Sequence, residues 1–155
     1  MKKILIILCL LLMIVGCSNS NSVANPMEKH ESLEELNELT HGHLCHPGVM
    51  GVSDEEYYTI KSGEDLIAEY SFVLNGTKYT VRFSDTVLKD DISGIYIDGK
   101  PAFESIDATD AKGEGKILTR WFTVDGQYVM MAEDSVDEPT FYAAVSEIMF
   151  LSTNY

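Results

Sequence analysis

Three Asx-Gly dipeptides divide the middle of the chain into short segments, and they constrain the fold more than any other feature. Asn75-Gly76, Asp98-Gly99 and Asp125-Gly126 each provide two residues that tolerate positive φ, as the two-residue turn of a β-hairpin requires. The segments beside them alternate apolar and polar side chains, which is the pattern of a half-buried strand. The sequence therefore predicts an antiparallel sheet of about six strands, at residues 57–60, 68–72, 79–83, 95–97, 117–124 and 128–131.

Helical patterns lie on both sides of these strands. Ser32 and Glu35 match the capping box that begins a helix, and Gly42 is placed to end it. Near the C-terminus, Pro139 suits a first helical turn, since its missing N–H would be unpaired there. The apolar faces of the two helices are Leu33, Leu36 and Leu39, then Phe141, Ala144, Val145, Ile148 and Met149. The sequence predicts a single α+β domain over residues 26–155, with a short N-terminal and a C-terminal helix packed on one face of the sheet.

The first residues have the organisation of an export signal. Lys2 and Lys3 precede an apolar run at residues 4–15, which as a helix would rise only ~18 Å against a hydrocarbon core of ~30 Å. Gly16-Cys17 then resembles the lipobox of bacterial lipoproteins. That resemblance implies a signal peptide at 1–16, a lipid on Cys17, and a flexible tether over 17–25 that anchors the domain outside the cell membrane. An ordinary secretory signal with a chance cysteine is the alternative.

The acidic composition excludes one class of partner. The chain has 25 Asp and Glu residues against 11 Lys and Arg, a formal charge of −14. Removal of Lys2 and Lys3 with the signal leaves nine basic residues and a charge of −16. Phosphate backbones repel such a surface, so no nucleic-acid partner is expected. The segments at 85–91 and 107–114 are interpreted as solvated acidic loops.

The stretch THGHLCHP concentrates the residues with metal-binding chemistry. If it is extended, His41, His43 and Cys45 lie on one face and His46 on the other, because side chains alternate. Imidazole and thiolate ligands suit zinc or copper, with His46, His30 or a carboxylate as a fourth ligand. The spacing departs from the paired forms common at metal sites.

Two other interpretations of THGHLCHP stay open. It could be an edge strand in which Cys45 is buried as a small hydrophobe. Cys45 has no disulfide partner, because Cys9 leaves with the signal and Cys17 would carry lipid, so it could also be a nucleophile with a histidine as its base. That catalytic role needs a cleft and an orienting Asn or Asp that the sequence does not place.

Several blocks in the same order resemble a known family over most of the chain from Asn25. They are NPMEKHESLEEL, IAEYSFVLNGTKYTVRFS, DISGIY and WFTVDGQYVMMAEDSVDEPTFYAAV. They are similar to an extracytoplasmic domain of unknown function from Gram-positive bacteria, found in small lipoproteins and in the outer part of anti-sigma-factor-like membrane proteins. The resemblance implies sensing or binding outside the membrane and attaches no catalytic residue. His43, Cys45 and His46 depart from it, since the family usually has an apolar strand there.

Together these patterns predict a lipid-anchored, extracytoplasmic binding or regulatory module that is not an enzyme. Its expected partners are the membrane, through Cys17, and a protein or peptide of the cell envelope. The alternative is a metal-binding lipoprotein that uses His41, His43, Cys45 and His46, and a Cys–His hydrolase or transferase is a second alternative. No other cofactor is expected.

Overall fold

The computed structural model of the protein describes residues 26–85, 91–105 and 107–153. The expected signal peptide at 1–16, the tether at 17–25 and the lipidated Cys17 lie outside the described residues. Neither helix in the described part of the chain is both long enough and apolar enough to cross a membrane.

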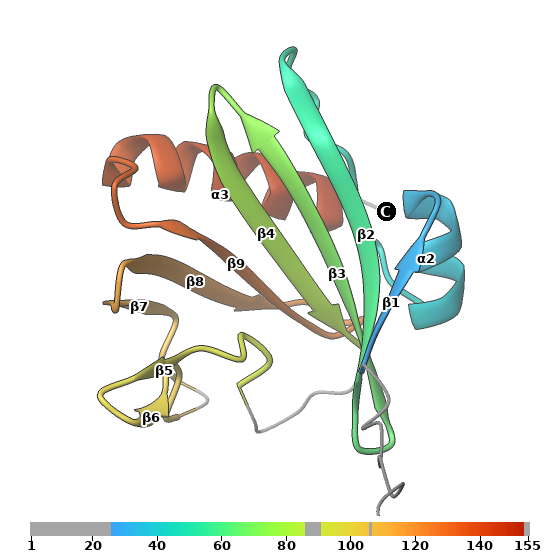
Figure 1. Ribbon diagram of the computed structural model, residues 1–155, viewed down its shortest axis with the longest axis horizontal. Coiled ribbons are helices and arrows are strands. Elements are labelled where there is room, and N and C mark those ends of the chain that lie inside the picture. The colour runs from blue at the N-terminus through green and yellow to red at the C-terminus, as the bar shows by residue number, and fades with distance from the viewer. Residues whose placement is uncertain (1–25, 86–90, 106, 154–155) are drawn as a thin grey trace, which may run out of the picture.

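A large antiparallel sheet with two helices makes up most of the described chain (Figure 1). The strands are β1 (Met27–His30), β2 (Val52–Ser62), β3 (Asp65–Leu74), β4 (Thr77–Ser84), β5 (Tyr96–Ile97), β6 (Lys100–Pro101), β7 (Asp110–Gly113), β8 (Lys116–Phe122) and β9 (Gln127–Glu133), and the helices are α2 (Leu33–Thr40) and α3 (Glu138–Thr153). The sheet runs in the order β1-β2-β3-β4-β9-β8-β7, and β5 pairs with β6 alone. The predicted α+β class is confirmed, with seven strands in the sheet instead of about six.

The Asx-Gly turns form where the sequence places them. Asn75 and Gly76 both have positive φ, 52° and 80°, and join β3 to β4, while Asp98 and Gly99 do the same between β5 and β6. The predicted strand at 95–97 therefore belongs to this small hairpin and not to the large sheet. The third turn is longer, because β8 ends at Phe122 and β9 begins at Gln127.

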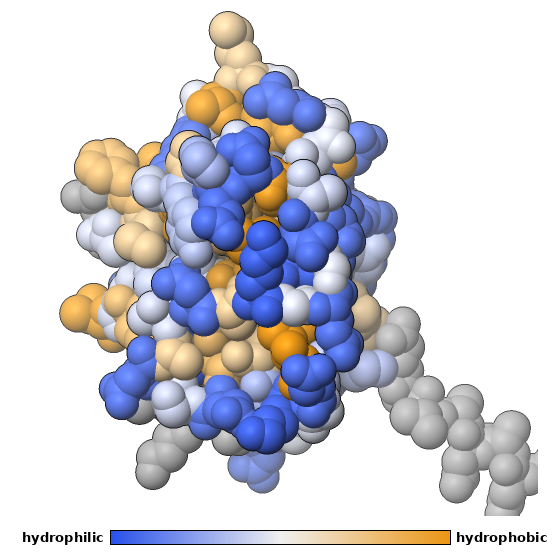
Figure 2. Space-filling model, turned by 90° about the vertical axis from the view of Figure 1, so that its left-hand side faces the viewer, coloured by the Kyte–Doolittle hydropathy of each residue, from blue (hydrophilic) through white to orange (hydrophobic). Residues whose placement is uncertain are grey.

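Both edge strands of the sheet lie in segments that the sequence does not mark as strands. β1 precedes the helix cap, and β7 lies within 107–114, so the interpretation of that segment as an acidic loop is wrong for residues 110–113. Both are edge strands of four residues, and edge strands are often short and charged, so they need not show the apolar alternation of an inner strand. The side of the molecule that carries β7 shows mostly hydrophilic side chains, with strongly hydrophobic ones in small separate areas (Figure 2).

Helix α2 begins as predicted and ends one residue earlier than expected. Ser32 accepts a hydrogen bond from the N–H of Glu35, and the Glu35 carboxylate accepts one from the N–H of Glu31. The left-handed residue that ends the helix is His41, with φ 53°, and not Gly42. Gly42 serves a different purpose, since a Cβ there would lie 2.9 Å from the ring of Phe83.

Each face of the sheet has its own apolar core. The larger core lies beneath α2 and α3, which contribute Leu33, Leu36, Phe141, Val145 and Ile148 to it. The smaller core, on the opposite face, consists of Ile67, Ile92, Phe103, Leu118, Val129 and Met131. Since α2 and α3 share the larger core, they cover the same face of the sheet, as predicted, and the segment that connects α2 to β2 passes between them.

Candidate functional site

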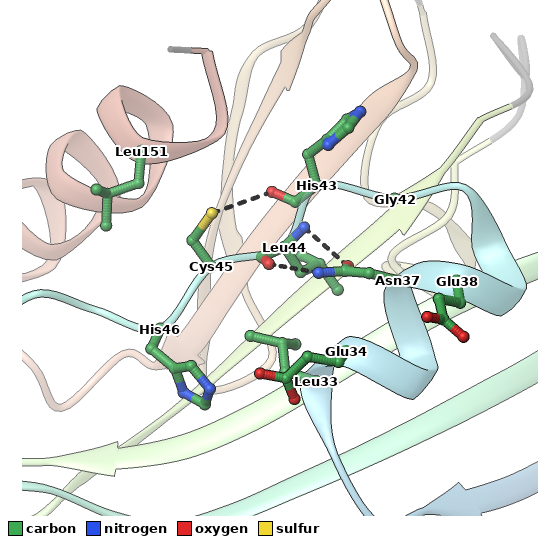
Figure 3. A pocket seen from close by; sticks show the side chains of 10 residues that line it. All are labelled: Leu33, Glu34, Asn37, Glu38, Gly42, His43, Leu44, Cys45, His46 and Leu151. Atoms are coloured by element: carbon green, nitrogen blue, oxygen red, sulfur yellow. Dashed lines mark hydrogen bonds between the residues drawn. The ribbon is translucent and has the colours of Figure 1, made fainter. Parts of the chain in front are cut away.

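A cavity of about 600 Å³ opens between α2, the segment at residues 42–46 and the last turn of α3 (Figure 3). We call it the α2–α3 groove. Its lining consists of Leu33, Glu34, Asn37 and Glu38 from α2, then Gly42, His43, Leu44, Cys45 and His46, and finally Leu151 from α3. Three of the four residues proposed from the sequence as metal ligands thus line one cavity, and His41 does not.

Asn37 fixes the floor of the groove. Its side-chain amide donates a hydrogen bond to the carbonyl oxygen of Leu44 at 2.8 Å and accepts one from the N–H of Leu44 at 3.0 Å (Figure 3). The amide therefore pairs with Leu44 as a neighbouring strand would, although residues 42–47 belong to no strand. With Leu44 held and its side chain buried, His43 and Cys45 are only partly buried beside it. The edge-strand interpretation of THGHLCHP is therefore wrong.

The four predicted metal ligands are not brought together. His41 ends α2, His43 Nε2 lies 4.0 Å from Asp125 Oδ2, and His46 Nδ1 lies 2.7 Å from the Glu55 carboxylate. Figure 3 shows the His43 and His46 imidazoles pointing to opposite sides of the segment.

His30, one of the alternatives suggested from the sequence for a fourth ligand, is also held elsewhere. His30 is buried and lies 3.0 Å from the Thr59 hydroxyl and 3.4 Å from the Glu35 carboxylate. Among the described residues, no group of three or more His, Cys, Asp or Glu side chains is arranged to hold a metal ion. The metal site suggested by THGHLCHP is therefore not assembled in the described part of the chain, because His43 lies beside Asp125, His46 beside Glu55 and His30 beside Thr59 and Glu35, at separate places.

The surroundings of Cys45 favour its thiol over the thiolate. The sulfur lies 3.5 Å from the carbonyl oxygen of His43, to which the thiol donates, and it points toward the side of the groove formed by α3 (Figure 3). Burial raises the pKa of the Cys45 thiol. An activated nucleophile needs the opposite shift, because the thiolate is the reactive form. This environment therefore argues against the Cys–His catalytic interpretation.

His46 belongs to a polar cluster that sequence reasoning missed. The Tyr70 hydroxyl donates to the Glu55 carboxylate at 2.5 Å and lies 3.4 Å from His46 Nδ1, and the Tyr70 ring stacks on Tyr57 with centroids 5.5 Å apart. Burial acts to raise the pKa of Glu55, but the hydrogen bonds from Tyr70 and His46 outweigh it and lower that pKa. Burial and the neighbouring Glu55 charge raise the pKa of Tyr70.

A β-bulge explains why Glu55 could not be assigned from the sequence. Ser53 pairs with Val73 and Glu56 with Ser71, so Asp54 and Glu55 together lie opposite the single residue Phe72. Asp54 adopts a positive φ of 51° to make the extra residue fit. Glu55 lies on the face of the sheet that carries Tyr57 and Tyr70, and the Tyr70 hydroxyl donates to it. The only sequence signal for the bulge is an Asp in the strand, which is a weak one.

Comparison with known proteins adds no evidence on the function of the site. No family model, curated protein or solved structure is significantly similar to this chain.

Proposed function

We propose that this chain is a lipid-anchored binding or regulatory module on the extracytoplasmic face of the cell membrane, and that the α2–α3 groove is its ligand site. The lipobox-like sequence at Gly16-Cys17 supports the location, and the resemblance to an extracytoplasmic domain of unknown function, found in small lipoproteins, agrees with it. The protein would act by binding and not by catalysis.

The observation that carries the proposal is the construction of the groove. Asn37 holds the groove floor through two hydrogen bonds to one residue, and the Cys45 thiol and the His43 and His46 imidazoles remain partly accessible above it. A preformed concave site with an apolar floor and a few polar groups is the usual form of a ligand site. The raised pKa of the Cys45 thiol supports binding over nucleophilic catalysis.

The first test concerns the anchor. The full-length protein is expressed in a Gram-positive host that is fed a clickable palmitate analogue. We expect label on the wild-type protein and on Cys45→Ser, and none on Cys17→Ser, because only Cys17 follows the lipobox-like sequence. Label that survives in Cys17→Ser, or a wild-type protein without label, would contradict the anchored location.

The second test concerns the groove. Cys45 is the one free thiol of the lipidated mature chain, so its alkylation rate reports whether the groove is occupied. Purified full-length protein in a neutral detergent is treated with iodoacetamide in the presence of basic, neutral and acidic amphipathic peptides. We expect saturable protection by at least one class. The control, Cys45→Ser with Ser62→Cys, places the thiol on an exposed strand end outside the groove and should show no protection. Protection by none of the three classes would count against the groove as a ligand site.

A further inference from the structure

Carboxylates border the α2–α3 groove, and none of its lining residues in the described chain is Lys or Arg. Glu34 and Glu38 are exposed and lie four residues apart on α2, so they project from the same side of the helix, one turn apart. Asp125 and Glu55 add negative charge beside His43 and His46. The potential in the groove is therefore negative and favours a cation.

The two helices reinforce this potential independently of the side chains. Glu38 in the last turn of α2 and Leu151 in the last turn of α3 both line the groove, so both helix C-termini border it. The first turn of α2 lines it as well, and there the acidic Glu34 offsets the positive helix N-terminus. A helix C-terminus carries partial negative charge, which a basic side chain in the last turn normally offsets. Neither α2 nor α3 has a basic residue in its last turn. The negative ends of both helices are thus left for a positively charged ligand to approach.

The floor and one wall of the groove are apolar. Leu33 and Leu44 are buried to 4% and 2% exposure beneath it, and Leu151 faces it from α3 (Figure 3). The neighbouring Phe150 is 66% exposed at the same helix end. Glu34, Glu38 and His46 at its border are exposed, so the groove is open to solvent along that side. An extended ligand with an apolar side therefore fits it.

From these observations we infer that the α2–α3 groove binds a basic amphipathic peptide segment of a partner protein. The apolar side of the segment would pack on Leu44 and Leu151, and its Lys or Arg residues would face Glu34, Glu38 and the two helix C-termini. This mode is that of an amphipathic segment lying in a groove. The inference rests on the proposed function and specifies the chemistry of its ligand.

The experiment measures fluorescence anisotropy of a labelled peptide of about 12 residues, roughly 18 Å long as a helix, with leucine on one side and lysine on the other. Full-length lipidated protein in neutral detergent is titrated against it. We expect saturable binding that weakens as salt rises. In Glu34→Gln with Glu38→Gln we expect binding about tenfold weaker, since two exposed ion pairs are lost. A matched control, Glu64→Gln with Glu114→Gln, removes the same charge from two hairpin turns outside the groove and should bind within about twofold of wild type.

A second measurement separates the groove from general attraction to an acidic protein. Wild-type protein alkylated at Cys45 with a bulky maleimide should no longer bind the peptide, whereas Cys45→Ser treated in the same way should bind it as before. Equal weakening by the groove variant and the control variant, or binding that survives alkylation, would overturn the inference. If the basic peptide fails to bind and an acidic or neutral peptide protects Cys45, the inference about charge is wrong and the groove remains a ligand site. If no class protects Cys45, the proposed ligand site fails with it.

Discussion

At the scale of single residues, Asn37 links the fold to the candidate site. Helix α2 is short, and the chain that follows it has no strand partner between residues 42 and 47. The Asn37 amide satisfies both backbone groups of Leu44, which would otherwise lie partly buried without a partner. The position of the groove floor therefore depends on one partly buried side chain of α2.

Replacing Asn37 tests this dependence. Asn37→Ala should lower the free energy of unfolding by about 1–2 kcal/mol, because the N–H and carbonyl of Leu44 lose their partners in a partly buried position. The loss is measured by urea unfolding of the full-length protein in detergent. Glu38→Ala, an exposed neighbour on the same helix, should cost less than about 0.5 kcal/mol. Similar losses in both variants would mean that the Asn37 amide does not hold the segment.

Glu55 makes a pH-dependent contribution to stability. The hydrogen bonds from Tyr70 and His46 hold the pKa of Glu55 below its ordinary value, against the opposing effect of burial. A carboxyl whose pKa is lower in the folded state stabilises the protein above its unfolded pKa, near 4.3, and that contribution is lost as pH falls through the folded value.

The stability difference between wild type and Glu55→Gln should therefore be largest above about pH 5 and should shrink as pH falls toward about 3. Its pH-dependent part should stay below about 1 kcal/mol, because the Glu55 side chain is 31% exposed and solvent screens it. Urea unfolding at a series of pH values measures the difference. In a Tyr70→Phe background the pH-dependent part should decrease, because one hydrogen bond to the carboxylate is gone. A difference that is constant from pH 7 to pH 3 would contradict this account.

At the scale of secondary-structure elements, local sequence chemistry predicts some features and misses others for identifiable reasons. The turns at Asn75-Gly76 and Asp98-Gly99 and the cap at Ser32 are local, so the residues themselves indicate them. The edge strands β1 and β7 depend on pairing with distant residues and carry no pattern of their own.

The candidate site shows the same limit. THGHLCHP correctly marks a segment that lines a cavity, but the direction of each side chain there depends on Asn37 and on packing between two helices that are distant in sequence. Spacing alone could therefore identify candidate ligands but could not show that His43 and His46 each lie beside a carboxylate from another element.

The bulge in β2 offers a test at this scale. Asp54 adopts a positive φ of 51°, which Gly accepts readily and a β-branched residue does not. Asp54→Gly should change the free energy of unfolding by less than about 1 kcal/mol, whereas Asp54→Val should lower it by about 1–3 kcal/mol. The neighbour Ser53, which is exposed and has no positive φ, provides the control Ser53→Val, with little expected loss. Equal losses for the two valine variants would mean that the backbone at Asp54 relaxes without cost.

At the scale of the whole molecule, the two faces of the sheet are covered in different ways. Helices α2 and α3 cover one face through apolar side chains. On the other face, arginines hold irregular segments in place. Arg82 pairs with Glu69 at 2.7 Å and donates to the carbonyl oxygens of Ile92 and Ser93. Arg120, buried to 2% exposure, donates to the carbonyl oxygens of Ser105 and Ala108, and its guanidinium lies 4.7 Å from the centre of the Phe103 ring.

This division predicts that the second face depends on a charge pair and not on apolar area alone. Glu69 and Arg82 side chains are only 10% and 19% exposed, so Arg82→Met leaves a mostly buried carboxylate without its cation and should cost about 3 kcal/mol. Combining it with Glu69→Leu removes that uncompensated charge and should recover at least about half of the loss.

Urea unfolding of both single variants and the double variant provides the cycle that measures this coupling. If the double variant is as unstable as Arg82→Met, the ion pair is not the main contribution. The important contacts would then be those from Arg82 to the carbonyl oxygens of Ile92 and Ser93, which are lost both in Arg82→Met and in the double variant. In that case Arg82 would act chiefly by fixing the irregular segment to the sheet, as Arg120 does at Ser105 and Ala108.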